Sequence, residues 1–181
     1  MPAAVLDEQA VLSAMVYVDL NPIRAAMAPD LESSDYTSIQ KRLRETAERL
    51  GDVDKLLKPI AGVPGELALG ISVRHYLGLV DWTGRVMHPT KRGKIEGTAP
   101  SVLDVLDIRE SGEQRPVLLD RFALSDGAWT NQVKGTESDF YRVIGAAEQI
   151  LDYAEDIGQR WLQGIGVARL LNERRAKPKP V

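Results

Sequence analysis

The chain has 181 residues, of which 44% are hydrophobic, and a formal net charge of −3 at pH 7. This length and composition suit one or two globular units that bury a substantial core. The absence of cysteine excludes disulfides, thiol nucleophiles and cysteine-ligated zinc. Apolar runs stay well below the roughly 20 residues that a membrane span needs, and the N-terminal residues lack a basic segment ahead of an apolar one. We therefore expect a soluble, cytoplasmic protein with no membrane partner.

The acidic average conceals a charge gradient. Up to Thr37 the chain carries six acidic residues and one basic residue, Arg24. The sign then reverses in three clusters, which are Lys41, Arg42, Arg44 and Arg49; Arg85, Lys91, Arg92 and Lys94; and Arg169, Arg174, Arg175, Lys177 and Lys179. Such clusters suit a polyanion, because each Lys or Arg placed on a phosphate releases condensed counterions. The plainer alternative is a solvated helix face or tail.

Helical spacing and capping residues recur along the chain, whereas strand signals are weak, which predicts a mainly α fold. A first helix is expected from Asp7 to about Leu20, where apolar residues recur at three-and-four spacing. We expect Asn21-Pro22 to end it, since the residue before a proline is pushed out of the α region. A second helix should begin at the capping box TSIQ, residues 37–40. Its apolar stripe continues through Ile39, Leu43 and Leu50.

A third helix is expected to follow, with Ser72 as its N-cap and Gly84 at its end. Its apolar face comprises Val73, Tyr76, Leu77 and Val80. Further helices are expected at residues 101–108, 116–124, 137–157 and 159–171. The tryptophans are interpreted as core anchors rather than base-stacking platforms; they are Trp82, Trp129 and Trp161.

The composition divides the chain into four segments. Residues 1–50 hold the first two helices, and residues 51–70 lose periodicity among glycines and prolines, as a connector does. Residues 71–172 form the helical C-terminal extension. Residues 173–181 are a basic, proline-containing tail with little to pack, which predicts disorder.

Tyr17 lies on the first helix, opposite the apolar arc and among mostly small or polar neighbours. Asn21 lies one turn beyond it on the same side, and its amide offers an oxygen to a metal or an N–H to a phosphate. A phenol with a pKa near 10 is a poor nucleophile unless a cation or metal assists it. The alternative is an amphipathic tyrosine that packs its ring on another element.

Asp19 is unusual because it falls inside the apolar arc of the same helix. A carboxylate there needs a partner, and the closest candidate in sequence is Arg24.

The segment YVDLNPIRA, residues 17–25, resembles the Y-x-x-x-N-P-[IV]-[RK] segment of the single-tyrosine HUH transposases, particularly the REP-associated tyrosine transposase branch. DYTSIQ, residues 35–40, looks like the short motif that follows in that family. Residues 76–85 with 91–95 are similar to a C-terminal extension of one subgroup. The resemblance covers most of the chain.

The resemblance implies that Tyr17 is the nucleophile and that Asn21 faces the metal site. The tyrosine would attack a phosphodiester, form a 5′-phosphotyrosine and free a 3′-hydroxyl, with Mg²⁺ or Mn²⁺ polarising the phosphate. The expected substrate is single-stranded DNA with hairpin ends. The DNA-contacting candidates are Arg24, Arg85, Lys91, Arg92 and Lys94.

The chain departs from this family at the metal site. The family carries a His-hydrophobic-His strand before the tyrosine helix, whereas only sixteen residues precede Tyr17 here and none is histidine. His75 and His88 are thirteen residues apart and cannot imitate two ligands on one strand. We therefore expect the helical C-terminal portion of an α+β transposase, with the catalytic sheet absent, binding no metal by itself and inactive alone.

Two alternatives stay open, a non-catalytic DNA-binding module and a helical protein-interaction module. A nucleotide cradle is not expected, since the sequence has neither a G-x-x-x-x-G-K-[ST] motif nor a strand-borne G-x-G-x-x-G. The oligomeric state is not indicated by the sequence.

Overall fold

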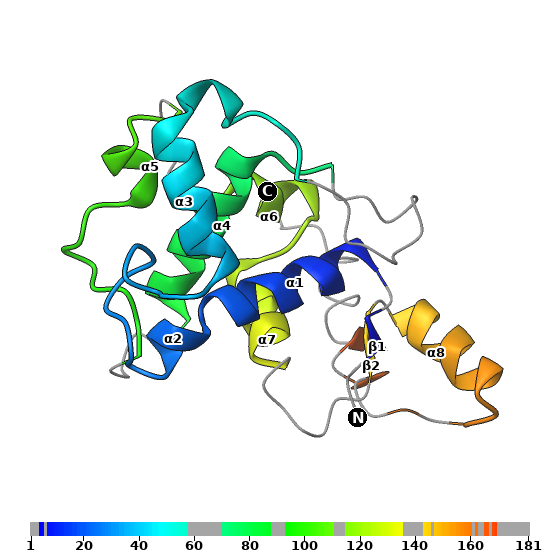
Figure 1. Ribbon diagram of the computed structural model, residues 1–181. Coiled ribbons are helices and arrows are strands. Elements are labelled where there is room, and N and C mark those ends of the chain that lie inside the picture. Colours follow the sequence, from blue (N-terminus) through cyan, green and yellow to red (C-terminus); the bar gives the residue numbers. More distant parts are fainter. Residues whose placement is uncertain are drawn as a thin grey trace, which may run out of the picture. The chain divides into compact units, whose positions relative to one another are not determined.

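The protein is mainly helical, as the sequence predicts (Figure 1). This computed structural model describes residues 4–5, 7–57, 70–87, 93–110, 115–135, 143–145, 147–160, 162, 165–166 and 168–169. The chain divides into two compact units: residues 15–121 form one, and residues 1–14 with 122–181 form the other. Within the described ranges, no helix combines the length and the apolar character needed to cross a bilayer.

The first helix, α1 (Glu8–Asp19), matches its prediction, but the Asn-Pro pair does not stop the helical path. Helix α2 (Asn21–Arg24) follows directly, and the Arg24 amide donates to the Leu20 carbonyl at 2.9 Å. Pro22 lies in the first turn of α2, where its missing N–H has no partner to lose. The first helix thus ends before the Asn-Pro pair, as the sequence predicts, and the pair begins a second short helix, because proline is well suited to the first turn of a helix.

The capping box of α3 (Ser38–Glu48) forms in one direction only. The Thr37 hydroxyl accepts from the Gln40 amide at 3.3 Å, as predicted. The Gln40 side chain turns instead to the preceding loop, where it donates at 2.8 Å to the Glu32 carbonyl and to the Asp35 carboxylate. The helix start is therefore correct, and the glutamine secures the loop before it.

The predicted stripe of α3 stops short of Leu50. Ile39 and Leu43 are buried, whereas Leu50 is 49% exposed because α3 ends at Glu48 and a 3₁₀ turn, η1 (Leu50–Asp52), begins there.

Helix α4 (Val73–Val86) begins at the predicted cap, where the Ser72 hydroxyl accepts from the His75 amide at 3.3 Å. It does not end at Gly84. A Cβ at Gly84 would lie 2.7 Å from Ile95 Cδ1 and 3.0 Å from Leu20 Cδ2. Gly84 is therefore needed because Ile95 and Leu20 pack closely against the helix there, and not because the helix ends in a left-handed backbone conformation.

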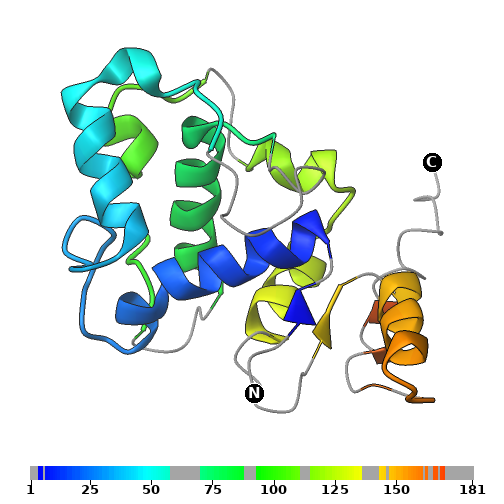
Figure 2. The same cartoon turned by 45° about the vertical axis from the view of Figure 1, so that its right-hand side comes forward.

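The two sides of the expected connector pack together in the unit of residues 15–121. Residues 58–69 lie outside the described part, but the Leu57 amide donates to the Ile71 carbonyl at 2.8 Å. Arg74 on α4 donates to both Asp54 oxygens at 2.8 and 2.9 Å. Helix α3 lies beside α4 (Figure 2). The compact unit thus continues across the segment boundaries expected from composition.

Three further helices have these bounds: α5 (Val102–Val105), α6 (Val117–Arg121) and α7 (Asp126–Gly135). The first two lie within the predicted short helices. Helix α7 was not predicted, because its polar, glycine-containing sequence has a weak apolar stripe. Its Trp129 is fully buried, which confirms the expectation of a core tryptophan there. Trp82 is half-buried, and Trp161 lies outside the described residues.

In the unit of residues 1–14 and 122–181, a short parallel pair replaces part of a predicted helix. Strand β1 (Ala4–Val5) pairs with β2 (Val143–Ile144), and α8 (Ala147–Asp156) follows. The helix expected at 137–157 therefore starts later, because the β-branched pair finds a distant strand partner. A hydrophobic core cluster of this unit comprises Val143, Ala147, Ile150, Ala154, Leu162, Ile165 and Ala168. The tail, residues 173–181, lies outside the described part.

A buried carboxylate joins three helices in the unit of residues 15–121. Asp19, at the end of α1, is 1% exposed. It accepts from the Ser38 hydroxyl at 2.7 and 2.9 Å and from the Ile39 amide at 3.1 Å, both in the first turn of α3. It also accepts from the Tyr76 hydroxyl of α4 at 2.6 Å. The partner expected from sequence, Arg24, is not among these donors.

Burial, together with the adjacent Asp19 carboxylate, raises the pKa of Tyr76 well above its usual value. The hydroxyl therefore stays protonated and keeps donating at neutral pH. This contribution to stability is present below about pH 10, the pKa of an unfolded tyrosine, and is lost as the pH rises through the raised folded-state pKa.

Removing the carboxylate should destabilise the fold strongly. Asp19→Ala would leave the buried Ile39 amide and Tyr76 hydroxyl, and the exposed Ser38 hydroxyl, without their acceptor, so we expect the free energy of unfolding to fall by about 3 kcal/mol or more. Tyr76→Phe removes one donor and should cost about 1–2 kcal/mol. Urea titrations measure both changes. The control is Glu45→Gln at an exposed position, which should change the free energy of unfolding by less than about 0.5 kcal/mol. Equal midpoints for Asp19→Ala and Glu45→Gln would contradict this role.

Candidate functional site

Tyr17 lies half-buried on α1, and a cation covers its ring. The guanidinium carbon of Arg24 lies 4.3 Å from the ring centroid, which is a cation–π distance. The two residues are seven apart, or about two helical turns. Arg24, the last residue of α2, reaches back over the Tyr17 ring across the junction between α1 and α2.

The Tyr17 hydroxyl makes no hydrogen bond to any of the described residues. Its environment differs from that of Tyr76, whose ring is fully buried and whose hydroxyl is held by a carboxylate. Asn21, the predicted neighbour, is exposed at the first position of α2. Tyr17 therefore combines a covered ring face with a hydroxyl that retains its capacity to donate.

The basic loop, residues 91–94, follows α4 in sequence, and its described residue Gly93 lies against Arg24. A Cβ at Gly93 would lie 2.2 Å from the Arg24 carbonyl oxygen, so only glycine permits this approach. The next residue, Lys94, is half-buried. Lys91 and Arg92 lie outside the described residues, as does His88. Packing thus brings Gly93 and Lys94, far apart from Tyr17 in sequence, to the residue that covers its ring.

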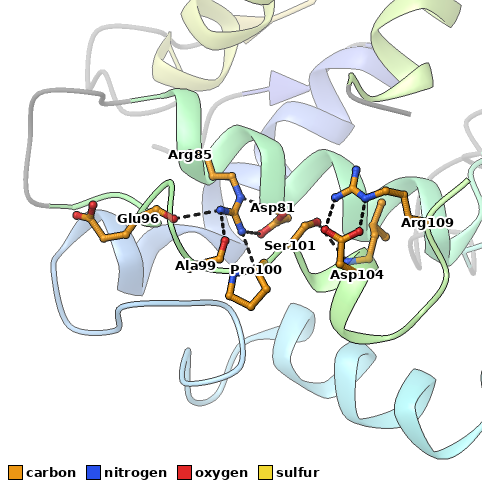
Figure 3. Close-up of polar contacts among 9 residues, drawn as sticks. Asp81, Arg85, Glu96, Ala99, Pro100, Ser101, Asp104 and Arg109 are labelled. Carbon is orange, nitrogen blue, oxygen red and sulfur yellow. Dashed lines mark hydrogen bonds and ion pairs between the residues drawn. The ribbon is translucent and has the colours of Figure 1, made fainter. Parts of the chain in front are cut away.

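Arg85 has a different role from the one expected. Its guanidinium donates to both Asp81 oxygens, at 2.9 and 3.1 Å, and to the carbonyls of Glu96, Ala99 and Pro100, at 3.1, 2.8 and 3.0 Å (Figure 3). These five bonds use all five N–H donors of an arginine. Arg85 therefore holds the loop of residues 96–100 on α4, and a phosphate would have to displace those bonds.

The side chains around Tyr17 do not fit a divalent metal. In the described ranges, no three His, Cys, Asp or Glu residues lie together as ligands would. The nearest carboxylate in sequence, Asp19, has its oxygens occupied by Ser38, Ile39 and Tyr76. His75 lies half-buried on α4. The described residues around Tyr17 therefore offer no ligand set for a divalent metal.

The structure brings together Tyr17 and Arg24 of the predicted site, places Gly93, the residue before Lys94, against the Arg24 backbone, and gives Arg85 other partners. Gly93 was missed, although a glycine within the basic run KRGK, residues 91–94, was a signal for a close backbone approach. Comparison with protein-family models, curated proteins and solved structures gives no match for this chain.

The approach of Gly93 to Arg24 gives a prediction with an internal control. Gly93→Ala places a methyl group inside contact distance of backbone, so the loop must move away, whereas a Cβ at Gly97 meets nothing within 4 Å. The Ile95 amide, which donates to the Gly84 carbonyl at 3.0 Å, reports the docked loop. Hydrogen exchange at Ile95 should accelerate at least tenfold in Gly93→Ala and stay unchanged in Gly97→Ala. Equal protection in both variants would show that the contact does not hold the loop.

Proposed function

We propose that this chain is a DNA-interacting protein related to the single-tyrosine transposases, and that Tyr17 with Arg24 forms its contact with a DNA strand. The observation that supports this most directly is the Arg24 guanidinium lying 4.3 Å from the centroid of the half-buried Tyr17 ring. Guanidinium groups match phosphate oxygens with paired donors. A phenol hydroxyl beside such a group adds one more donor for the same phosphate.

The neighbouring loop extends this surface. Gly93 contacts Arg24, and Lys94 is the next residue in the chain. Lys91 and Arg92 directly precede Gly93 in the sequence. The proposed DNA-contacting set is therefore Arg24, Lys91, Arg92 and Lys94, without Arg85. We propose that this set forms a basic surface on a chain whose net charge is −3.

Strand cleavage would need more than this pair supplies. In the reaction that the resemblance implies, the Tyr17 oxygen bonds to phosphorus, its proton goes to a base, and the 3′-oxygen leaves and takes up a proton. Arg24 would offset charge on the phosphate. The sequence lacks the family's histidine pair, so we propose that this chain binds DNA and does not cleave it alone.

Phosphate binding at Arg24 predicts a specific salt dependence. Arg24→Gln should lower the slope of log affinity against log salt by about one and weaken binding of a hairpin oligonucleotide with a single-stranded flank. Tyr17→Phe keeps the ring beneath Arg24 and should change affinity less than about twofold, since one neutral hydrogen bond is lost. Fluorescence anisotropy at several salt concentrations measures both. Arg44 is an exposed arginine on α3, so Arg44→Gln is the matched control. If Arg44→Gln lowers the slope as much as Arg24→Gln does, the assignment of a phosphate contact to Arg24 is contradicted.

The absence of cleavage is tested separately. Incubation of the protein with a labelled hairpin oligonucleotide and Mg²⁺ or Mn²⁺ should give no covalent adduct on denaturing electrophoresis, and Tyr17→Phe should behave identically. An adduct present in the original chain and missing in Tyr17→Phe would overturn the inactive part of the proposal and leave the DNA-binding part standing.

A helical protein-interaction module is the second candidate. Large apolar side chains are exposed on the described surface, and the most exposed are Met27 at 82% and Tyr36 at 104%. Aromatic and methionine side chains are enriched in protein interfaces. This candidate gains support if neutralising Arg24 and Lys94 together leaves DNA affinity unchanged.

A further inference from the structure

A second site candidate is a cavity of about 310 Å³ within the unit of residues 15–121. It lies between α4, α5 and the loop of residues 97–100, and Arg109 and Arg115 complete its lining. None of the lining residues belongs to α1 or α2, so the cavity is separate from the Tyr17–Arg24 pair. Its volume is at the lower end of the range for small-molecule sites.

Two arginine–carboxylate pairs line this cavity side by side (Figure 3). Asp81 holds Arg85, which is fully occupied as described above. Asp104 holds Arg109 through Nε and through Nη2, the latter at 3.1 Å. The hydrogen bond from Arg109 lowers the pKa of Asp104, so this carboxylate stays ionised at neutral pH. Arg109 is thus oriented before any ligand arrives, which reduces the ordering cost of binding.

Arg115 adds a further guanidinium. It forms an ion pair with Asp120, which is not a lining residue, while Arg115 itself lines the cavity. The side chains of Arg109 and Arg115 are 33% and 32% exposed, so solvent reaches both. The charged lining comprises three arginines and two aspartates, and the third aspartate, Asp120, pairs with Arg115 from outside the lining. The cavity therefore presents more guanidinium than carboxylate groups to a ligand, which suits an anionic group of that ligand.

Trp82 supplies the apolar part of the lining. Its indole is half-buried and faces the cavity beside Pro100 and Pro116. Tryptophan presents the largest π-face of any side chain, and stacking on an aromatic ring stabilises a bound nucleobase by about 1–3 kcal/mol. An inorganic anion would make no use of this face, and a neutral apolar ligand would make no use of the arginines.

We propose that this cavity binds one nucleotide, with its base stacked on Trp82 and its phosphate on Arg109 and Arg115. If the nucleotide belongs to a DNA strand, the inference rests on the proposed function. A free nucleotide presents the same base and phosphate, and the experiment below separates the two sources. The cavity uses arginine side chains where a glycine-rich loop would use backbone N–H groups, so the absence of such motifs does not count against it.

The test uses the full chain and isothermal titration calorimetry. The probes are the four deoxynucleoside monophosphates, deoxyadenosine, inorganic phosphate and a short single-stranded oligonucleotide. We expect the best nucleotide to bind at least tenfold more tightly than deoxyadenosine or phosphate, since it alone uses both parts of the site. Trp82→Leu and the double variant Arg109→Gln with Arg115→Gln should each weaken nucleotide binding at least tenfold, whereas Arg44→Gln should not.

Trp82→Phe keeps an aromatic face and should recover most of the affinity lost in Trp82→Leu, which separates stacking from a general loss of structure. A urea midpoint within the error of the original chain confirms that each variant folds. Binding of mononucleotides identifies a free-nucleotide site. Binding of the oligonucleotide alone, weakened by the cavity variants, identifies one nucleotide of a strand.

The outcomes also separate this inference from the proposed function. If the oligonucleotide binds and is weakened by Arg24→Gln but not by the cavity variants, and mononucleotides do not bind, the cavity proposal is overturned and the proposed function stands. If mononucleotides bind through Trp82 and the oligonucleotide does not bind, the cavity proposal stands and the proposed function fails. Absence of binding by every probe overturns both.

Discussion

The carboxylate of Asp19 fixes the relation between the three helices on which the candidate site depends. A charge that is 1% exposed would be unfavourable alone, but four hydrogen bonds from Ser38, Ile39 and Tyr76 offset the loss of water. Asp19 is also the last residue of α1, and α2 begins two residues later. Tyr17 lies just before this junction and Arg24 lies after it, and the two form a cation–π contact across it.

Glycine and arginine residues then place the basic loop. Gly84 admits Ile95 and Leu20, Gly93 admits the Arg24 backbone, and Arg85 binds three loop carbonyls while Asp81 orients it. Arginines that look alike in sequence thus divide into two kinds. Arg85 has all its donors satisfied within the fold, whereas the half-buried Arg24 places its guanidinium over an aromatic ring.

An arginine beside an aromatic ring recurs in both proposed binding regions, with Tyr17 and Arg24 in one and Trp82, Arg109 and Arg115 in the other. Both combinations suit nucleic acid, since a nucleotide has a planar base and an anionic phosphate. The relation to single-tyrosine transposases remains a hypothesis from the segment YVDLNPIRA. The two binding proposals have separate tests and do not depend on that relation for their outcome.

The sequence by itself determined the features that form within a few residues. The starts of α3 and α4 were predicted correctly because Thr37 and Ser72 bond to amides three residues ahead. The spacing of Tyr17 and Asn21 likewise follows from the chain alone. The partners of Asp19 lie 19 and 57 residues away along the chain for Ser38 and Tyr76, so local spacing pointed wrongly to Arg24. The close contacts of Gly84 and Gly93, the pairing of β1 with β2 and the cavity beside Trp82 also required tertiary structure, because hydrogen bonds and van der Waals contacts between distant residues exist only after the helices have packed.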